Sequence, residues 1–190
     1  FVVTFLDSPS QETDNSIRAT VWQTSQDTGV LTATSSTITT TPDAGDIVRL
    51  PSVAALDDGS YMVVYDFFDA SLNELTVRAR HVDANGEQGP EMTLIDGAPF
   101  SAGFTDVTAL ENGSFVAIYH GFVSGDLGIV QQIFDAAGPV GFPSFVADTA
   151  LNGVADVDAS VIGLADGGYV IAWNELAGSS SNIKFQIYES

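Results

Sequence analysis

Acidic side chains that follow apolar segments are the residues of this chain best suited to binding a metal ion. One stretch, residues 66–74, and a second one near residue 156 carry oxygen-bearing side chains, and we expect them to converge at one end of the fold. Calcium takes roughly six to eight oxygen ligands, typically from loop carboxylates. The predicted calcium ligands are Asp66, Asp69, Asn73, Glu74, Asp156 and Asp158. EF-hand spacing is absent, and the alternative is that these acids are solvated or cap turns.

Paired carboxyl groups could also hydrolyse a glycosidic bond, one as the acid and the other as base or nucleophile. Acids are so numerous, 25 Asp and Glu, that the sequence singles out no pair. Nucleophilic and metal-hydrolase motifs are missing: there is no cysteine, and His81 and His120 are the two histidines. The aromatic residues beside the acids, Phe67, Phe68 and Phe122, are predicted to stack on a sugar or anchor a partner, unless they fill gaps inside the fold.

The elements that position these residues recur with a fixed period. The stretches Leu56–Tyr61, Leu110–Phe115 and Leu164–Tyr169 share one pattern, and their glycines at 59, 113 and 167 are 54 residues apart. A fixed period of this size is typical of a repeat architecture. The Asp-Gly or Asn-Gly pair in the pattern predicts a type I′ hairpin turn, with positive φ at both central residues.

Each repeat contains four strand-like segments. An apolar run over 51–56 is followed by a wholly apolar run over 61–65, which predicts a strand buried on both faces. The segment 75–82 alternates apolar and polar residues, and a short strand follows over 91–95. The sequence therefore predicts an all-β fold, a β-propeller-like array of four-stranded antiparallel blades. A β-sandwich is the alternative.

The predicted units are residues 1–47, 48–99, 100–153 and 154–190, all in one repeat domain. The first unit lacks its first strand and the last lacks its fourth, so we expect 14 strands, grouped three, four, four and three. The Thr/Ser-rich residues 32–41 are predicted to be the last strand of the first unit. We expect the chain to be a window of a longer propeller.

Charge excludes several classes of partner. The chain has 5 Lys and Arg against 25 Asp and Glu, a net charge of −20, and a pI near 4.1. This balance argues against binding nucleic acid or anionic membranes, and no apolar run is long enough for a membrane-spanning helix. Acidity, the absence of cysteine and the scarcity of lysine favour an extracellular, secreted protein.

Two segments resemble a known repeat. P-S-V-A-A-L-D-D-G-S-Y-M-V-V-Y at 51–65 and Q-Q-I-F-D-A-A-G-P-V-G at 131–141 look like repeats of very large secreted bacterial proteins, often of the RTX group exported by type I secretion, many of them marine. The resemblance covers Val48 to Ser190 and implies secretion. The G-G-x-G-x-D calcium repeat that defines RTX proteins is absent.

We expect from these observations a non-catalytic structural, adhesive or ligand-binding segment of a large extracellular bacterial protein. Its predicted partners are the rest of the same polypeptide, a glycan, calcium, another protein or further copies of itself. One alternative is part of a propeller glycoside hydrolase or another polysaccharide-acting enzyme. The other is a subunit of an extracellular filament, joined by strand addition.

Overall fold

Runs of β-branched and aromatic residues form 14 strands in the part of the chain that the structure describes. The structure is a computed structural model that describes residues 1–7, 16–24, 28–40, 43, 45–98, 103–123, 126–148, 155–177 and 179–190. The strands are β1 (Val2–Asp7), β2 (Ser16–Thr24), β3 (Leu31–Thr40), β4 (Ile47–Ala55), β5 (Tyr61–Asp69), β6 (Glu74–Val82), β7 (Gln88–Ala98), β8 (Gly103–Ala109), β9 (Phe115–Val123), β10 (Asp126–Asp135), β11 (Gly138–Asp148), β12 (Ala155–Gly163), β13 (Tyr169–Ala177) and β14 (Ser180–Tyr188).

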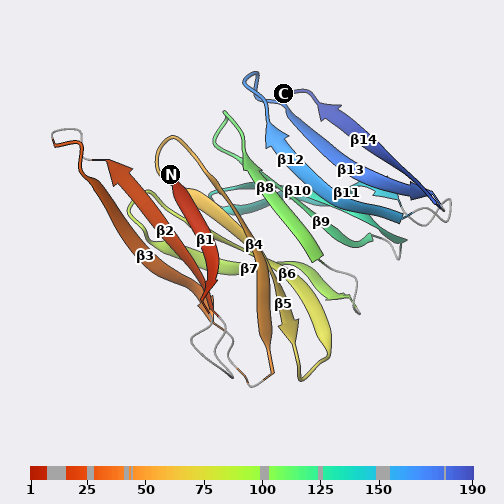
Figure 1. Cartoon of the computed structure of the whole chain (residues 1–190), viewed down its shortest axis with the longest axis horizontal. Helices are drawn as coiled ribbons and strands as arrows, with labels where there is room; N and C mark the ends of the chain where they lie inside the picture. Colours follow the sequence, from red (N-terminus) through yellow and green to blue (C-terminus); the bar gives the residue numbers. More distant parts are fainter. Residues whose placement is uncertain are drawn as a thin grey trace.

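Neighbouring strands in the chain pair with each other and build four antiparallel sheets. Their strand orders are β1-β2-β3, β4-β5-β6-β7, β8-β9-β10-β11 and β12-β13-β14. Figure 1 shows these sheets following one another from the N-terminal to the C-terminal end of the molecule. The prediction of a β-propeller-like array of antiparallel blades is confirmed. No helix long and apolar enough to cross a membrane occurs among the described residues.

The second strand of each four-stranded sheet is the centre of the core. In β5, residues 61–67 are all buried, because alternate side chains face the preceding and the following sheet. Tyr65 packs with Ile17 and Ala19 of β2, whereas Val64 packs with Ala117 of β9. The wholly apolar run therefore does form a strand that is buried on both faces.

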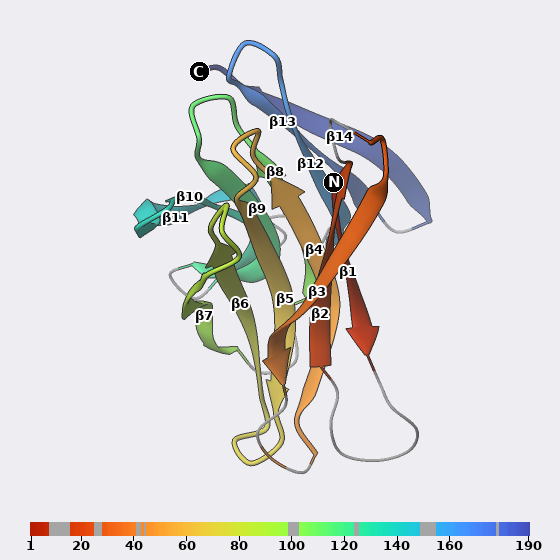
Figure 2. The same ribbon diagram turned by 90° about the vertical axis from the view of Figure 1, so that its left-hand side faces the viewer.

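The first strands of neighbouring sheets lie side by side along the inner edge of the array. Viewed from the side, β4 and β8 run next to each other, and β12 continues the series beyond β8 (Figure 2). Backbone approach is tight here, because a Cβ on Gly163 of β12 would come within 2.5 Å of the carbonyl oxygen of Ala109 in β8. These inner strands therefore form one continuous surface shared by three sheets.

The prediction of type I′ hairpin turns is wrong. At the first of the three repeated turns only Gly59 has positive φ, 92°, and its N–H donates to the carbonyl oxygen of Leu56 at 3.0 Å. The Asp58 carboxylate accepts from the backbone N–H and hydroxyl of Ser60, at 2.8 and 2.6 Å. This is a three-residue loop, in which a type I turn is followed by a glycine bulge. The Asp58 side chain stabilises the turn through its hydrogen bonds to Ser60.

Candidate functional site

A bulge interrupts the inner strand of three successive sheets at the same place in the repeat. Strand pairing shifts within residues 49–52 of β4, 103–106 of β8 and 157–160 of β12, windows that are 54 residues apart. Bulges redirect side chains and are over-represented next to active sites. The repeat therefore brings three equivalent irregular segments to one inner surface.

The backbone is strained at two of these bulges. Leu50 and Asp158 occupy equivalent repeat positions, and both have positive φ, 51° and 53°. A left-handed conformation is tolerated by aspartate but is uncommon for a branched residue such as leucine. Residues held in such conformations cluster at functional sites, where the surrounding structure maintains them.

The three bulges surround an open pocket of about 380 Å³. This volume falls within the range of roughly 300–1,000 Å³ that is usual for small-ligand sites. Each inner strand contributes two lining residues: Leu50 and Pro51, Thr105 and Asp106, and Asp158 and Ala159. The pocket, which we call the bulge pocket, is the candidate functional site.

Asp106 joins the three inner strands at this pocket. Its Oδ1 accepts from the hydroxyl of Ser52 at 2.8 Å and from the N–H of Val107 at 2.9 Å. Its Oδ2 accepts from the hydroxyl of Ser160 at 2.8 Å and from the N–H of Val161 at 3.0 Å. Asp106 is not among the predicted calcium ligands, although the spacing of 52, 106 and 160 matches the 54-residue repeat. The carboxylate is thus held in place by donors from all three sheets.

Asp158 is the accessible carboxylate of the bulge pocket. Its side chain is exposed, and its Oδ2 accepts a long hydrogen bond, 3.4 Å, from the amide of Asn174. His120 lies nearby on β9: burial lowers the pKa of its imidazole, and the negative charge of Asp158 acts in the opposite direction. Asp158 lies within β12, because that strand continues past its bulge.

Asp66, the first predicted calcium ligand, is fully buried in β5. Its Oδ2 lies 3.5 Å from Nε of Arg49, and neither carboxylate oxygen has a hydrogen-bond partner among the described residues. Burial raises the pKa of this carboxyl to about 6, although Arg49 acts to lower it. Asp66 occupies the repeat position of His120 and Asn174, but its carboxylate does not line the bulge pocket.

The other predicted calcium ligands are not gathered around one point. The apolar run predicts a strand over 61–65, but β5 extends through Asp69 because Phe67 and Phe68 continue its pairing with β6. Asp69 caps the following turn, and hydrogen bonds from Ser71 and Leu72 lower the pKa of its carboxyl.

Three predicted ligands remain. Asn73 lies in that turn with φ of 56°, and Glu74 begins β6. Asp156 belongs to β12, and its side chain lies outside the described part of the structure. Nowhere do the described residues gather three or more histidine or acidic side chains that could hold a metal ion. Calcium binding stays a prediction.

The three predicted aromatic contacts have different surroundings. Phe67 is 1% exposed and fills the space between the first two sheets, where its ring lies under the Arg78 guanidinium at 3.5 Å. Phe68 is partly buried against Leu75 and its neighbours between the second and third sheets. Phe122 belongs to β9, and its side chain lies outside the described set. Phe67 is therefore part of the core in this structure.

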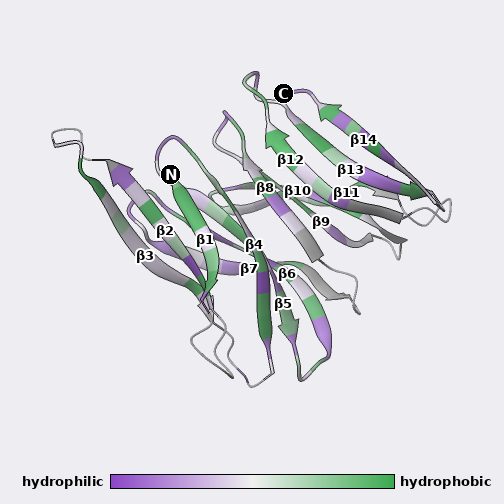
Figure 3. Cartoon of the chain, viewed as in Figure 1, coloured by the Kyte–Doolittle hydropathy of each residue, from purple (hydrophilic) through white to green (hydrophobic). Residues whose placement is uncertain are grey.

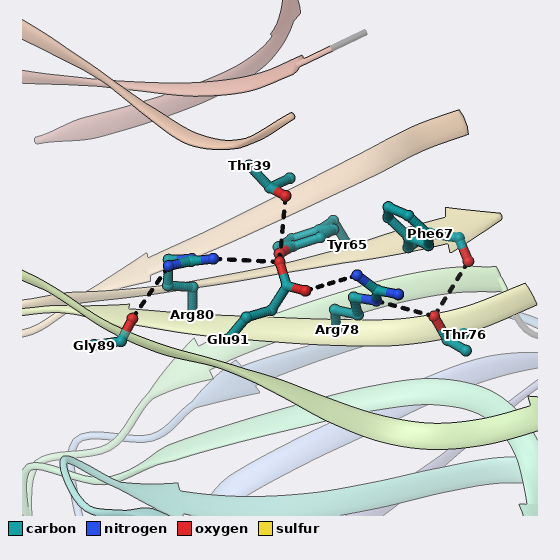
Figure 4. A network of polar contacts seen from close by, with 8 residues as sticks. All are labelled: Thr39, Tyr65, Phe67, Thr76, Arg78, Arg80, Gly89 and Glu91. Carbon is teal, nitrogen blue, oxygen red and sulfur yellow. Dashed lines mark hydrogen bonds and ion pairs between the residues drawn. The ribbon is translucent and has the colours of Figure 1, made fainter. Parts of the chain in front are cut away.

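A second polar cluster lies between the first and second sheets, and the carboxylate of Glu91 at its centre is engaged by neighbouring side chains. The Glu91 carboxylate accepts from Arg78 at 2.7 Å, from Arg80 at 3.3 Å and from Thr39 at 3.2 Å, and the Tyr65 hydroxyl also donates to it (Figure 4). Although burial acts to raise it, the pKa of Glu91 is lowered by these hydrogen bonds and positive charges. The cluster is not named among the predicted sites, although its arginines lie on the polar face of the alternating segment 75–82. It ties the sheets together and leaves little capacity for a ligand.

Another pocket, of about 360 Å³, lies between the repeated turns of the second and third sheets. Its acidic lining residues are Asp57, Asp58 and Glu111, on turns outside the inner strands. Asp58 is committed to its own turn through Ser60. The bulge pocket is the stronger candidate because it combines strained backbone, three converging strands and an accessible carboxylate.

Comparison with known proteins identifies the fold. No protein-family model matches the chain, and no curated protein is similar to it in sequence. Among solved structures, an α-L-arabinanase of Penicillium chrysogenum complexed with arabinobiose is 14% identical with a TM-score of 0.53, over 92% of this chain and 55% of its own. A GH43 endo-arabinanase of Bacillus licheniformis is 16% identical with a TM-score of 0.52, over 98% of this chain and 71% of its own.

A NanB sialidase of Streptococcus pneumoniae is 13% identical with a TM-score of 0.54, over 99% of this chain and 29% of its own. The chain thus spans about half of the Penicillium arabinanase and under a third of the sialidase. The prediction of a non-catalytic structural or adhesive segment is wrong on this comparison, because these solved structures, which share the fold, are glycoside hydrolases. They belong to the class that the sequence left open as the alternative. The comparison shows that the chain has the β-propeller fold.

Proposed function

We propose that this chain forms the sugar-binding centre of a propeller glycoside hydrolase or another polysaccharide-acting enzyme. The observation that carries the proposal is the bulge pocket, where three equivalent bulges place Asp106 and Asp158 in one depression. Glycoside hydrolysis uses carboxyl groups beside the scissile bond, and Asp158 is the carboxylate of this pocket that a sugar can reach. The likeness to the arabinanase and sialidase propellers supports this reading through the fold alone.

The two carboxylates would have different tasks. Asp158 is exposed, and among the described residues its carboxylate accepts one long hydrogen bond, so it can meet a sugar hydroxyl or the glycosidic oxygen. Asp106 receives four hydrogen bonds, which hold it and the three inner strands in a fixed geometry. A site that is rigid before the substrate arrives loses less entropy on binding.

The charge around the pocket favours a neutral sugar over an acidic or phosphorylated one. All five cationic side chains of the chain lie within 4.0 Å of a carboxylate, in the pairs Arg18–Asp7, Arg49–Asp66, Arg78–Glu91, Arg80–Glu91 and Lys184–Glu175. An anionic ligand would therefore meet the carboxylates of Asp106 and Asp158 in a chain of net charge −20. Like charges repel, most strongly at low salt. Acidity and the absence of cysteine support an extracellular setting, where polysaccharides are found.

The test is binding and hydrolysis of a neutral and an acidic glycan by the 190-residue chain. Calorimetric titration and reducing-sugar release would be measured with linear arabinan oligosaccharides and with sialyllactose. Asp158→Asn should weaken binding or cleavage of the neutral sugar at least about tenfold. Asp57→Asn removes the same charge from a turn outside the bulge pocket and should leave sugar binding and cleavage unchanged. Failure of the wild-type chain to bind or cleave any glycan of a broader panel would overturn the proposal.

A further inference from the structure

The wall that β4 contributes to the bulge pocket is apolar. Leu50 and Pro51 line this side, Asp158 and Ala159 of β12 line the other, and β8 lies between the two strands. Figure 3 shows mostly hydrophobic colour along β4 and a hydrophilic band on the neighbouring β8. The pocket therefore combines one apolar wall with one wall that carries an accessible carboxylate.

Leu50 holds a backbone conformation that its residue type and its neighbour both disfavour. Its φ of 51° lies in the left-handed region, where a residue with a Cβ is strained. A residue that precedes a proline normally has an extended backbone, with φ near about −120°, so Pro51 adds to the cost. Among the described residues other than glycine, Asn73 and Asp158 also have positive φ, and both are of types that tolerate it. Leucine is the exception.

Side chains of the next sheet maintain this conformation. The hydroxyl of Thr105 in β8 donates to the carbonyl oxygen of Leu50 at 3.0 Å. The neighbouring carboxylate of Asp106 accepts from the hydroxyl of Ser52 at 2.8 Å. The bulge of β4 is therefore fixed by β8 both before and after Pro51.

The strain at Leu50 is not needed to form the bulge. A glycine or an asparagine at position 50 would adopt the same backbone at lower cost. What leucine adds is an apolar side chain on the wall of the pocket. Residues held in strained conformations by their surroundings cluster at ligand-binding and active sites.

We propose that Leu50 packs on the apolar face of a neutral sugar ring in the bulge pocket, while Asp158 accepts a hydrogen bond from one of the sugar hydroxyls. The inference rests on the proposed function and names the part of the sugar that each wall of the pocket binds. A sugar ring carries C–H groups on its faces and hydroxyl groups around its rim. It therefore matches a pocket that has one apolar and one acidic wall.

An apolar contact of this kind has its own thermodynamic signature. Burial of apolar surface on binding makes the change in heat capacity negative. Replacing Leu50 with a polar residue should therefore make the heat-capacity change of sugar binding less negative. A loss of fold stability alone would not produce this effect.

The experiment is calorimetric titration of the 190-residue chain with linear arabinan, xylan and mannan oligosaccharides at several temperatures, together with thermal unfolding. Leu50→Asn keeps a side chain of similar size that tolerates positive φ, and Leu50→Met keeps an apolar side chain. Leu72→Asn is the matched control, because it makes the same change at an exposed leucine in the turn between β5 and β6, outside the pocket.

Leu50→Asn should bind the sugar at least about tenfold more weakly than the wild type, with a less negative heat-capacity change. Its melting temperature should rise by about 2–4 °C, because asparagine relieves the strain at position 50. Leu50→Met should recover most of the affinity that asparagine loses, and Leu72→Asn should match the wild type in both measurements.

The outcomes separate this inference from the proposed function. A wild-type chain that binds a sugar with the same affinity as Leu50→Asn would overturn the inference and leave the proposed function standing. Weaker binding by Leu50→Asn together with a lower melting temperature would show that Leu50 acts through the fold, and would also overturn the inference. A wild-type chain that binds no glycan would overturn both.

Discussion

Removing the Asp106 carboxylate should loosen the three inner strands of the propeller together. In Asp106→Ala, the hydroxyls of Ser52 and Ser160 can turn to water, but the N–H groups of Val107 and Val161 lose their partner. Each unsatisfied buried donor costs about 1–3 kcal/mol. Both valines are buried, with 6% and 7% of their surface exposed, so we expect the free energy of unfolding to fall by about 3 kcal/mol.

Urea unfolding followed by tryptophan fluorescence measures this loss. With a slope of roughly 2–3 kcal/mol per molar urea, the midpoint should fall by about 1 M. Asp57→Ala is the control, because it removes an acid from an exposed turn of the same highly negative chain and should change stability by less than about 0.5 kcal/mol. Equal urea midpoints for the two variants would contradict a role of the Asp106 carboxylate in holding the inner strands.

A double-mutant cycle locates the effect. If Asp106 acts through the inner strands, Ser160→Ala should lower the free energy of unfolding by about 1 kcal/mol in the wild-type chain. The same substitution should have close to no effect in Asp106→Ala. Additive losses for the two substitutions would show that the hydrogen bond between their side chains contributes no stability.

Four further substitutions test other parts of the fold. The Asp66 carboxyl has a pKa of about 6 in the folded protein against an ordinary 3.8, so the folded state binds this proton more tightly than the unfolded state. The free energy of unfolding should therefore fall by up to about 3 kcal/mol as pH rises from about 4 to about 6. Asp66→Asn should remove that fall, seen as a difference between the two melting-temperature profiles; parallel profiles would contradict it. Glu91→Ala should lower the free energy of unfolding by about 3 kcal/mol, because the guanidinium groups of Arg78 and Arg80 lose their shared carboxylate. Tyr65→Phe, which removes one donor to that carboxylate, should lower it by less. Gly163→Ala should destabilise by about 2 kcal/mol, since its Cβ would meet the carbonyl oxygen of Ala109; unchanged thermal unfolding would show that the inner strands can separate without loss.

The strand pattern of this fold was readable because it depends on local periodicity. A wholly apolar run such as 61–65 must be buried on both faces, and the structure buries it between two sheets. Turn geometry was less predictable. An Asp-Gly pair suits a two-residue turn as well as a three-residue loop, and the carboxylate of Asp58 stabilises the longer one by bonding to Ser60.

The limits of strands were misjudged where apolar residues continued beyond the repeated core. Phe67 and Phe68 extend the pairing of β5, so Asp66 is carried into the interior of the protein and Asp69 to the start of a turn. Charge alone does not tell a buried aspartate from a solvated one. The difference arises from which neighbouring sheet covers the residue.

The sequence by itself determined the period, the all-β blades and the acidic surface, because these depend on residue types and on spacings along one strand. Only the tertiary structure decided which of the many acids share a pocket. Asp106 and Asp158 are brought together because successive inner strands pack side by side with equivalent bulges, a relation between residues about one repeat apart.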